Sequence, residues 1–196
     1  QKMTGDDEVQ QDVDRRRESW YSKNKLRHWR RKQMWKIIQA TKENIPQIAP
    51  LIADFRVALK SYKGIRAVPN RSAAAEEAAE YLDADFPIFV AVEDTHFVGY
   101  LVCRVEKPCV WVESIYVEET GRRRGIASAL FAEAEKLAAS YGQETVYNYV
   151  HPNNDGMIAF LRQHGYTVLN LVEIRKPRAG ETLSRKIHVE TQEFDY

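Results

Sequence analysis

The sequence predicts a mixed α/β fold built around a mostly antiparallel sheet. Three strand-like runs between residues 87 and 118, separated by short polar links, predict an antiparallel meander. A long helix with an apolar stripe is predicted at residues 126–141, and another strand at residues 144–150. Because a helix that links two strands commonly sets them parallel, part of this sheet should be parallel.

Two helices are predicted between the first strand and the meander. Residues 35–40 (WKIIQA) alternate enough to predict the first strand. Thr41 can cap the helix that follows, although Pro50 favours a late start or a kink in it. After a loop, Ser72 can cap a second helix over residues 73–82.

The remaining elements complete the fold. The strands of the meander are expected at residues 87–94, 96–106 and 109–118. Gly142 stands where the cap of the long helix favours glycine. Residues 153–165 predict a short helix, and residues 166–176 and 183–194 predict a closing hairpin.

Composition is that of an ordinary globular protein. The 196 residues carry 29 Lys or Arg and 28 Asp or Glu, a formal net charge of +1, so the chain is no polyelectrolyte. No apolar run approaches the about 18 residues of a membrane span, and the polar amino end lacks the apolar segment of a secretory signal. Cys103 and Cys109 match no metal-binding spacing. We therefore expect reduced thiols, no metal, no membrane contact and a cytoplasmic location.

The amino-terminal end differs in charge from the rest of the chain. Residues 15–33 carry nine Lys or Arg against one Glu, with Trp20, Tyr21 and Trp29 interleaved. We therefore separate residues 1–33, a charged and possibly helical extension, from one domain at 34–196. Within that domain we expect a core at 34–176 and a closing hairpin at 166–196.

Three roles stay open for the extension. It could be a helix that packs its tryptophans on its own domain or on a second copy in a homodimer. It could be an arm that binds nucleic acid, because basic residues interleaved with aromatic ones suit a phosphate backbone and its bases. It could also be a loosely ordered tail. In all three cases we expect its removal to leave cofactor affinity unchanged.

Three consecutive arginines run directly into a glycine and the long helix at residues 122–127 (RRRGIA). The first amides of a helix have no acceptor within the helix and bind anions. Glycine lets a ligand approach the main chain, and arginines add charge-assisted hydrogen bonds to phosphate oxygens. The pattern predicts a cradle for a pyrophosphate, with a plain solvated turn as the alternative.

The same residues carry a family resemblance. RRRGIA fits the pattern Arg/Gln-x-x-Gly-x-Gly/Ala, so this stretch resembles the acetyl-CoA signature of the GNAT family of N-acetyltransferases, with Arg122, Gly125 and Ala127 at its fixed positions. The preceding ESIYVEET resembles that family's fourth strand, and Asn154 precedes a Gly-aromatic pair at the spacing the family shows. The resemblance covers residues 34–176. It implies the GNAT fold, in which a mostly antiparallel sheet with a splayed parallel pair is flanked by about four helices.

The resemblance also implies acetyl-CoA as co-substrate and a role for particular residues. The main chain around Val117 should pair with the pantetheine arm, the amides from Arg123 to Ala127 should hold the pyrophosphate, and two further residues should lie on the cofactor's other side. The implied cofactor-binding residues are Ile115, Tyr116, Val117, Arg122, Arg123, Arg124, Gly125, Ile126, Ala127, Asn154 and Phe160.

The predicted activity is transfer of acetyl to a primary amine by direct attack in a ternary complex. Glu113 is the candidate base, since strand alternation should place it on the same face as Val117; a surface or arginine-paired glutamate is the alternative. Many family members have a tyrosine acid where this chain has Leu161. In its place Tyr147, Tyr149 and His151 stay open as proton donors, as does water.

Two further questions stay open. The acceptor is either a small amine or an amine of a protein or peptide. Because the family's tyrosine is absent, the alternative function is a non-catalytic module that binds acetyl-CoA or CoA. In that case the basic arm would contact nucleic acid or a protein.

Overall fold

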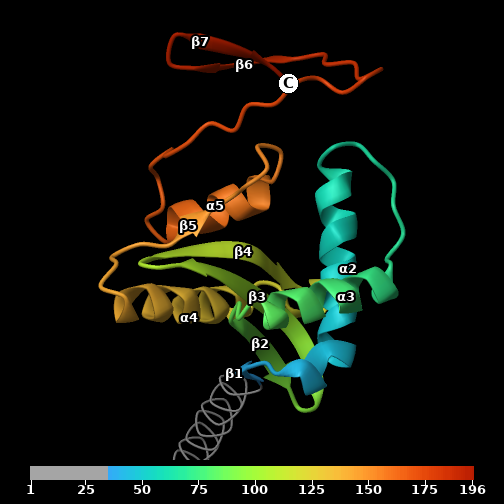
Figure 1. Cartoon of the computed structure of the whole chain (residues 1–196), viewed down its shortest axis with the longest axis vertical. Helices are drawn as coiled ribbons and strands as arrows, with labels where there is room; N and C mark the ends of the chain where they lie inside the picture. Colours follow the sequence, from blue (N-terminus) through green and yellow to red (C-terminus); the bar gives the residue numbers. More distant parts are fainter. Residues whose placement is uncertain (1–34) are drawn as a thin grey trace, which may run out of the picture. The chain divides into compact units, whose positions relative to one another are not determined.

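The computed structural model describes residues 35–196 and confirms the predicted mixed α/β fold (Figure 1). The predicted extension, residues 1–33 with its three aromatic residues, lies outside the described part. The strands are β1 (Trp35–Gln39), β2 (Ile88–Glu93), β3 (His96–Glu106), β4 (Cys109–Val117), β5 (Tyr147–Asn148), β6 (Lys186–Val189) and β7 (Gln192–Asp195). The helices are α2 (Ile45–Ser61), α3 (Arg71–Asp83), α4 (Ile126–Ser140) and α5 (Asp155–Gln163), with 3-10 turns η1 (Lys42–Asn44) and η2 (Glu119–Gly121).

The central sheet has five strands in the order β1-β2-β3-β4-β5. The first four are antiparallel neighbours, as the meander predicts, whereas β4 and β5 are parallel. The parallel pairing is confined to two residue pairs, Trp111 with Tyr147 and Val112 with Asn148. The predicted splayed pair is therefore present, because β4 continues for five residues beyond its last partner in β5.

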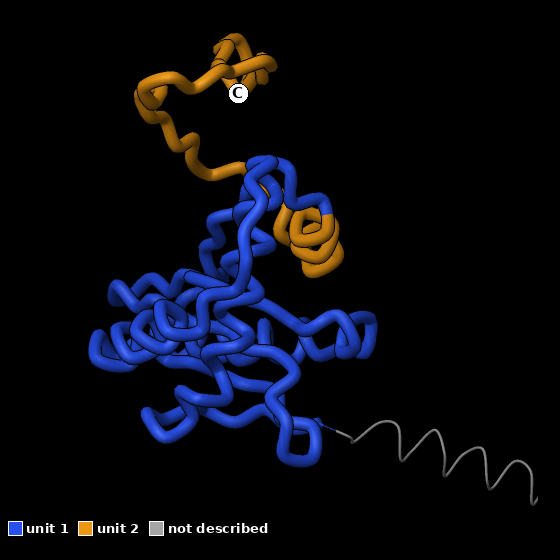
Figure 2. The backbone as a smooth tube through the Cα atoms, turned by 90° about the vertical axis from the view of Figure 1, so that its right-hand side faces the viewer, with its two compact units in different colours: residues 1–155 blue, residues 156–196 orange. Residues whose placement is uncertain are grey.

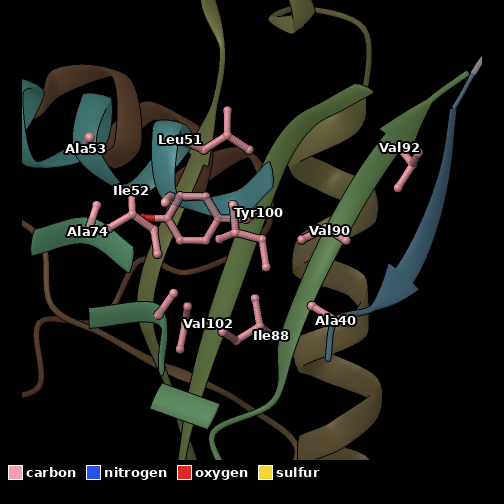
Figure 3. Close-up of a cluster of buried hydrophobic side chains, with 13 residues drawn as sticks. Ala40, Leu51, Ile52, Ala53, Ala74, Ile88, Val90, Val92, Tyr100 and Val102 are labelled. Carbon is pink, nitrogen blue, oxygen red and sulfur yellow. The ribbon is translucent and has the colours of Figure 1, made fainter. Parts of the chain in front are cut away.

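Helices cover both faces of this sheet. On one face, Tyr100 of β3 is buried against Ile52 of α2 and the β2 side chains Ile88 and Val90 (Figure 3). The ring of Phe55, also in α2, meets the Tyr100 ring edge-on with 6.3 Å between centroids. The other face packs on α4, whose buried residues are Ile126, Leu130, Phe131, Ala134 and Ala138.

The chain forms two compact units, residues up to Asp155 and residues 156–196 (Figure 2). The first unit contains the five-stranded sheet and helices α2, α3 and α4. The second contains nearly all of α5 and the separate antiparallel hairpin of β6 and β7. Within residues 35–196, no helix combines the length and the hydropathy needed to cross a bilayer.

Several predicted boundaries are wrong. Asn70, and not Ser72, caps α3, because the Asn70 side-chain oxygen accepts a hydrogen bond of 3.1 Å from the amide of Ala73. The strand predicted at 144–150 is reduced to the two residues of β5. Around it, the side chains of Thr145 and Asn148 bond to the carbonyl oxygen of Val146, which diverts a main-chain acceptor from strand pairing.

The closing hairpin is also shorter than predicted. Residues 166–176 form no strand, and the predicted partner segment pairs within itself as β6 and β7. The connection between them turns at Glu190, whose φ is +54°. A strand needs a hydrogen-bonding partner, and this local pairing leaves none for residues 166–176 within the hairpin. Apolar side chains of that stretch are exposed, among them Val168, Leu169, Leu171 and Ile174.

Candidate active site

The turn before α4 has the geometry of an anion site. Arg123 and Gly125 both have left-handed φ angles, +61° and +83°. A Cβ built on Gly125 would meet no atom within 4 Å, so the main chain there is open on the side that a side chain would occupy. The first amides of α4 follow directly and have no acceptor within the helix. This turn can therefore present several N–H groups to one anion.

Arg122 folds back on the strand that precedes it. Its Nε donates a hydrogen bond of 3.1 Å to the carbonyl oxygen of Val117, and its guanidinium lies 5.6 Å from the centroid of the Tyr116 ring. Burial raises the pKa of the Tyr116 phenol. Arg122 thus fixes the path from β4 into the turn.

Arg124 reaches a different strand. Its guanidinium donates two hydrogen bonds to the carboxylate of Glu93 at the end of β2, one of them 2.9 Å from Nη1 to Oε2. Hydrogen bonding to Arg124 lowers the pKa of the Glu93 carboxyl. Within residues 35–196, the side chain of Arg123 has no polar partner, so it keeps its charge available to a ligand.

The second feature of the site is the edge of β4 that faces β5. From Glu113 to Val117, β4 has no strand neighbour on that side within the described residues. The predicted pantetheine-binding residues Ile115, Tyr116 and Val117 all lie in this stretch. Its main-chain groups can therefore pair with an extended ligand as if that ligand were an added strand.

Two glycines bring this end of β4 close to α4. A Cβ on Gly99 would lie 3.0 Å from the carbonyl oxygen of Tyr116 and 3.3 Å from Cγ2 of Ile126. A Cβ on Gly121 would lie 3.1 Å from Cγ1 of Val117. Larger residues at either position would push the strand and the helix apart. The strand edge and the helix amides consequently form one continuous site.

Glu113 occupies a β-bulge in β4. Val102 of β3 pairs with Ser114, and the next residue, Cys103, pairs with Val112, which leaves Glu113 as the extra residue. Side chains alternate between the faces of a regular strand, and an inserted residue shifts that alternation by one. Two residues that are four apart across the bulge therefore lie on opposite faces.

The expectation that Glu113 shares a face with Val117 is consequently wrong. The Oε2 atom of Glu113 lies 3.5 Å from Nε of Arg104, and Arg104 pairs with Trp111 on the face covered by α2 and α3. Val117 instead packs near Gly99 on the α4 face. Glu113 is thus paired with an arginine, the alternative that the sequence left open for it.

Aromatic rings surround this ion pair. The Arg104 guanidinium lies 5.3 Å from the Trp111 ring and 5.9 Å from the Tyr149 ring. The rings of Tyr147 and Tyr149 both lie against Trp111, with ring centroids 4.7 and 4.9 Å from it. Both tyrosines that the sequence left open as proton donors therefore belong to one cluster with Arg104, the partner of Glu113.

Asn154 follows a turn that is bound to the end of α2. Its amide donates a hydrogen bond of 2.8 Å to the carbonyl oxygen of His151, and the Asn153 side chain donates one of 2.9 Å to the carbonyl oxygen of Tyr62. The His151 ring stacks on the Tyr62 ring at 6.1 Å. Burial, and then the charge of Lys63, lower the pKa of His151, so the imidazole is neutral at pH 7.

Phe160 and Leu161 belong to α5 in the second unit. The ring centroid of Phe160 lies 4.5 Å from that of His164. Leu161 is buried, and its carbonyl oxygen accepts a hydrogen bond of 3.0 Å from the amide of Tyr166. The position at which the family resemblance implies an acid is thus a buried apolar side chain.

The structure brings Tyr116 and Val117 beside Arg122 and Ile126. It places the Glu113 side chain on the opposite face of the sheet. It adds four residues that the sequence reasoning missed: Glu93, Gly99, Arg104 and Gly121. No sequence signal links Glu93 to Arg124 or Arg104 to Glu113, because those partners are chosen by strand register. Gly99, a glycine inside an apolar strand, carried the one available signal, since such a residue often marks a close backbone approach.

Comparison with known proteins shows the family of the chain. The model of the acetyltransferase (GNAT) family matches residues 55–166, more than half of the chain. The chain therefore belongs to the GNAT family, and the expected class of enzyme, an N-acetyltransferase, is confirmed. A search of curated proteins returned no match.

Solved structures share the fold at low sequence identity. An aminoglycoside acetyltransferase from an uncultured soil metagenomic sample, in complex with trehalose, is 21% identical, with a TM-score of 0.57 over 74% of this chain and 97% of its own. The aminoglycoside N-acetyltransferase AAC(6')-Iy in complex with CoA is 20% identical, with a TM-score of 0.57 over 74% and 95%. A possible acetyltransferase from Clostridium difficile 630 is 18% identical, with a TM-score of 0.56 over 74% and 100%.

Proposed function

We propose that this protein transfers acetyl from acetyl-CoA to a primary amine by direct attack within a ternary complex. The observation that carries the proposal is the junction of two features, the unpaired edge of β4 and the left-handed turn before α4. An extended ligand whose narrow arm leads into a diphosphate matches both features. Acetyl-CoA has that arrangement, because its pantetheine arm is joined to a diphosphate, and the family uses it.

Different parts of the site bind different parts of acetyl-CoA. The main chain from Ile115 to Val117 takes the pantetheine arm as an added strand. The amides from Arg123 to Ala127 take the pyrophosphate. The carbonyl oxygen of Val117 already accepts a hydrogen bond from Arg122, which leaves its N–H as the principal group offered to the ligand. The family resemblance assigns Asn154 and Phe160 to the same cofactor.

The reaction requires a neutral amine. A lysine-like amine with a pKa near 10.4 is neutral in only about one molecule in 2,500 at pH 7. In our proposal Glu113 accepts the amine proton through a water molecule, and the Val117 amide donates to the oxyanion of the tetrahedral intermediate. Arg104 lies beside the proposed base, with its Nε 3.5 Å from Oε2 of Glu113, and orients that carboxylate.

The departing thiolate also needs a proton. Leu161 cannot supply one, and the two tyrosines beside Trp111 have phenols in the neighbourhood of the base. Tyr149 is the better candidate, because it is 59% exposed and its ring lies next to Arg104. Replacement of Tyr149 by Phe would remove this donor and keep the ring. A normal rate in that variant would leave water as the donor.

The first acceptors to test are small polar amines. The structural relatives named above include aminoglycoside acetyltransferases, and aminoglycosides are such amines. Protein and peptide amines are the second pool, and a peptide amino terminus, with a pKa near 8, needs less help from a base. A cytoplasmic location, where acetyl-CoA and reduced thiols occur together, agrees with the two free cysteines.

Two measurements test the proposal. Titration calorimetry with CoA should give a saturable heat, and incubation with acetyl-CoA and pooled amines should release free thiol and acetylated products. Absence of CoA binding would overturn the proposal entirely. Binding without turnover on any amine pool would favour the non-catalytic module, for which the apolar residue at 161 is the specific observation.

A further inference from the structure

The three arginines before α4 are not equivalent. Arg122 is bonded to a main-chain carbonyl, and Arg124 is bonded through two N–H groups to the Glu93 carboxylate. Arg123 is exposed and has a left-handed φ of +61°. Of these three arginines, only Arg123 has a guanidinium without a polar partner among residues 35–196.

We propose that Glu93 is a positioning residue for the cofactor turn. Through Arg124 it holds the left-handed turn in the conformation that presents the α4 amides and Arg123 to the diphosphate. Arg122 and Arg124 then support the turn and do not themselves bind phosphate. This inference rests on the proposed function, because it concerns the same cofactor.

Glu93 is a firm point of attachment. It is the last residue of β2, and it pairs with Trp35 of β1 and with His96 of β3. Its side chain is only 17% exposed. A bidentate arginine–carboxylate pair fixes the orientation of the guanidinium as well as its distance. The pair therefore connects the turn to the rigid sheet across 31 residues of sequence.

The turn needs such a support. Arg124 lies between two residues with left-handed φ angles, Arg123 and Gly125. A left-handed conformation at a residue with a Cβ persists only where its surroundings impose it. The Arg124 side chain fixes this turn to β2, whereas Arg122 fixes it only to β4, the strand that leads into it.

Electrostatics argues against Arg124 as a phosphate ligand. If its guanidinium turned towards a phosphate, it would give up its two hydrogen bonds to Glu93. An unpaired carboxylate would then remain near an incoming anion, and two like charges repel each other. Arg123 could bind a phosphate without giving up a hydrogen bond and without leaving a carboxylate unpaired.

The direction in which Glu93→Ala changes the affinity for CoA distinguishes a positioning role of Arg124 from a role as phosphate ligand. If Glu93 positions the turn, Glu93→Ala should weaken CoA binding about tenfold, the size expected for loss of a charged hydrogen bond. If Arg124 were a phosphate ligand with Glu93 as its competitor, the same substitution should tighten binding. Titration calorimetry with CoA measures the change in affinity in either direction. Unchanged or tighter binding by Glu93→Ala overturns the inference.

A double-mutant cycle tests whether Glu93 acts through Arg124. Arg124→Ala and the double variant should both resemble Glu93→Ala, because each removes the same support. Additive losses would mean that Arg124 contacts the diphosphate independently, and would overturn the inference. Arg123→Ala should weaken CoA binding in addition to the loss caused by Glu93→Ala.

A substrate without phosphates distinguishes positioning from a general structural role. With acetyl-pantetheine as acyl donor, kcat/KM of Glu93→Ala should match the wild type, while KM for acetyl-CoA rises. An equal loss with both donors would assign Glu93 to the stability of the fold alone. Glu119→Ala, which removes the same charge near the turn, is the matched control and should bind CoA normally.

A second Glu93 variant and the wild-type protein serve as controls for these measurements. Glu93→Gln keeps the shape of the side chain, so it replaces Glu93→Ala if thermal unfolding shows that the alanine variant is not folded. If the wild type itself does not bind CoA, the proposed function fails. If the wild type binds CoA and the Glu93 variants bind it equally well, only this inference fails.

Discussion

Nε of Arg104 lies 3.5 Å from Oε2 of Glu113, inside a cluster formed by Trp111, Tyr147 and Tyr149. The carboxylate of the candidate base is therefore oriented by a guanidinium that also lies close to the Trp111 and Tyr149 rings. Replacement of Glu113 should consequently lower the rate.

Glu113→Gln should lower kcat/KM by about 100-fold, the lower end of what a positioned base contributes. The acidic limb of the pH–rate profile should also disappear, because the amide does not titrate. The profile is measured with the best amine from the acceptor pools. A variant with unchanged rate and unchanged limb would retire Glu113 as the base and would point to an acceptor with a low pKa.

Gly125→Ala and Gly142→Ala form a pair of substitutions at the two ends of α4. Both glycines have left-handed φ angles, +83° and +75°, and at both a Cβ would meet no atom within 4 Å. Each substitution should therefore cost roughly 1–2 kcal/mol in the free energy of unfolding. Only Gly125→Ala should also weaken CoA binding, as calorimetry can measure. Equal CoA affinities in the two variants would remove Gly125 from the cofactor site.

Gly99→Ala should be more destabilising than Gly121→Ala. At Gly99 the nearest atom to a new Cβ is the main-chain oxygen of Tyr116 at 3.0 Å, whereas at Gly121 it is a methyl group of Val117 at 3.1 Å. A side-chain methyl can move aside more easily than the main chain of a central strand. We expect a loss of about 1–3 kcal/mol for Gly99→Ala, measured by denaturant unfolding. The reverse order would contradict the close packing of β4 on α4.

Cys109 should react with thiol reagents in the folded protein, and Cys103 should not. Burial raises the pKa of the Cys103 thiol from 9.0 to about 12, whereas Cys109 is partly exposed. Alkylation followed by mass spectrometry should find the label on Cys109 alone, and Cys109→Ser should abolish fast labelling. Fast modification of Cys103 in that variant would show that β3 opens readily.

The raised pKa of the Cys103 thiol also makes the free energy of unfolding depend on pH under alkaline conditions. Above pH 9.0 the unfolded chain ionises Cys103 while the folded chain keeps it protonated, so stability should decrease as pH rises towards about 12. Cys103→Ala should reduce that dependence. Chemical denaturation at several pH values would measure it.

The features that could be predicted from sequence are those fixed by local pattern. The apolar stripe and terminal glycine of residues 126–142 predicted α4 to within one residue. The meander followed from short polar links between strand-like runs. The turn at Gly125 was predictable because a glycine between consecutive arginines and a helix is typical of an anion-binding turn.

The features that were missed depend on partners distant in sequence. The bulge at Glu113 arises because two residues of β4 oppose one step of β3, a relation that one strand cannot reveal by itself. Glu93 could not be assigned from sequence, since any of several carboxylates could have met Arg124. Asn70 was overlooked in favour of Ser72 because both residue types cap helices and stand two positions apart.

Within residues 35–196, the edge of β4 from Glu113 to Val117 has no strand neighbour, and this has one more consequence. A row of main-chain N–H and C=O groups without a strand partner is a template on which a strand of another molecule can add. A ligand lying along this row would block such self-association. The protein should therefore tolerate higher concentrations, and exchange the amide hydrogens of this stretch more slowly, when its co-substrate is supplied during purification.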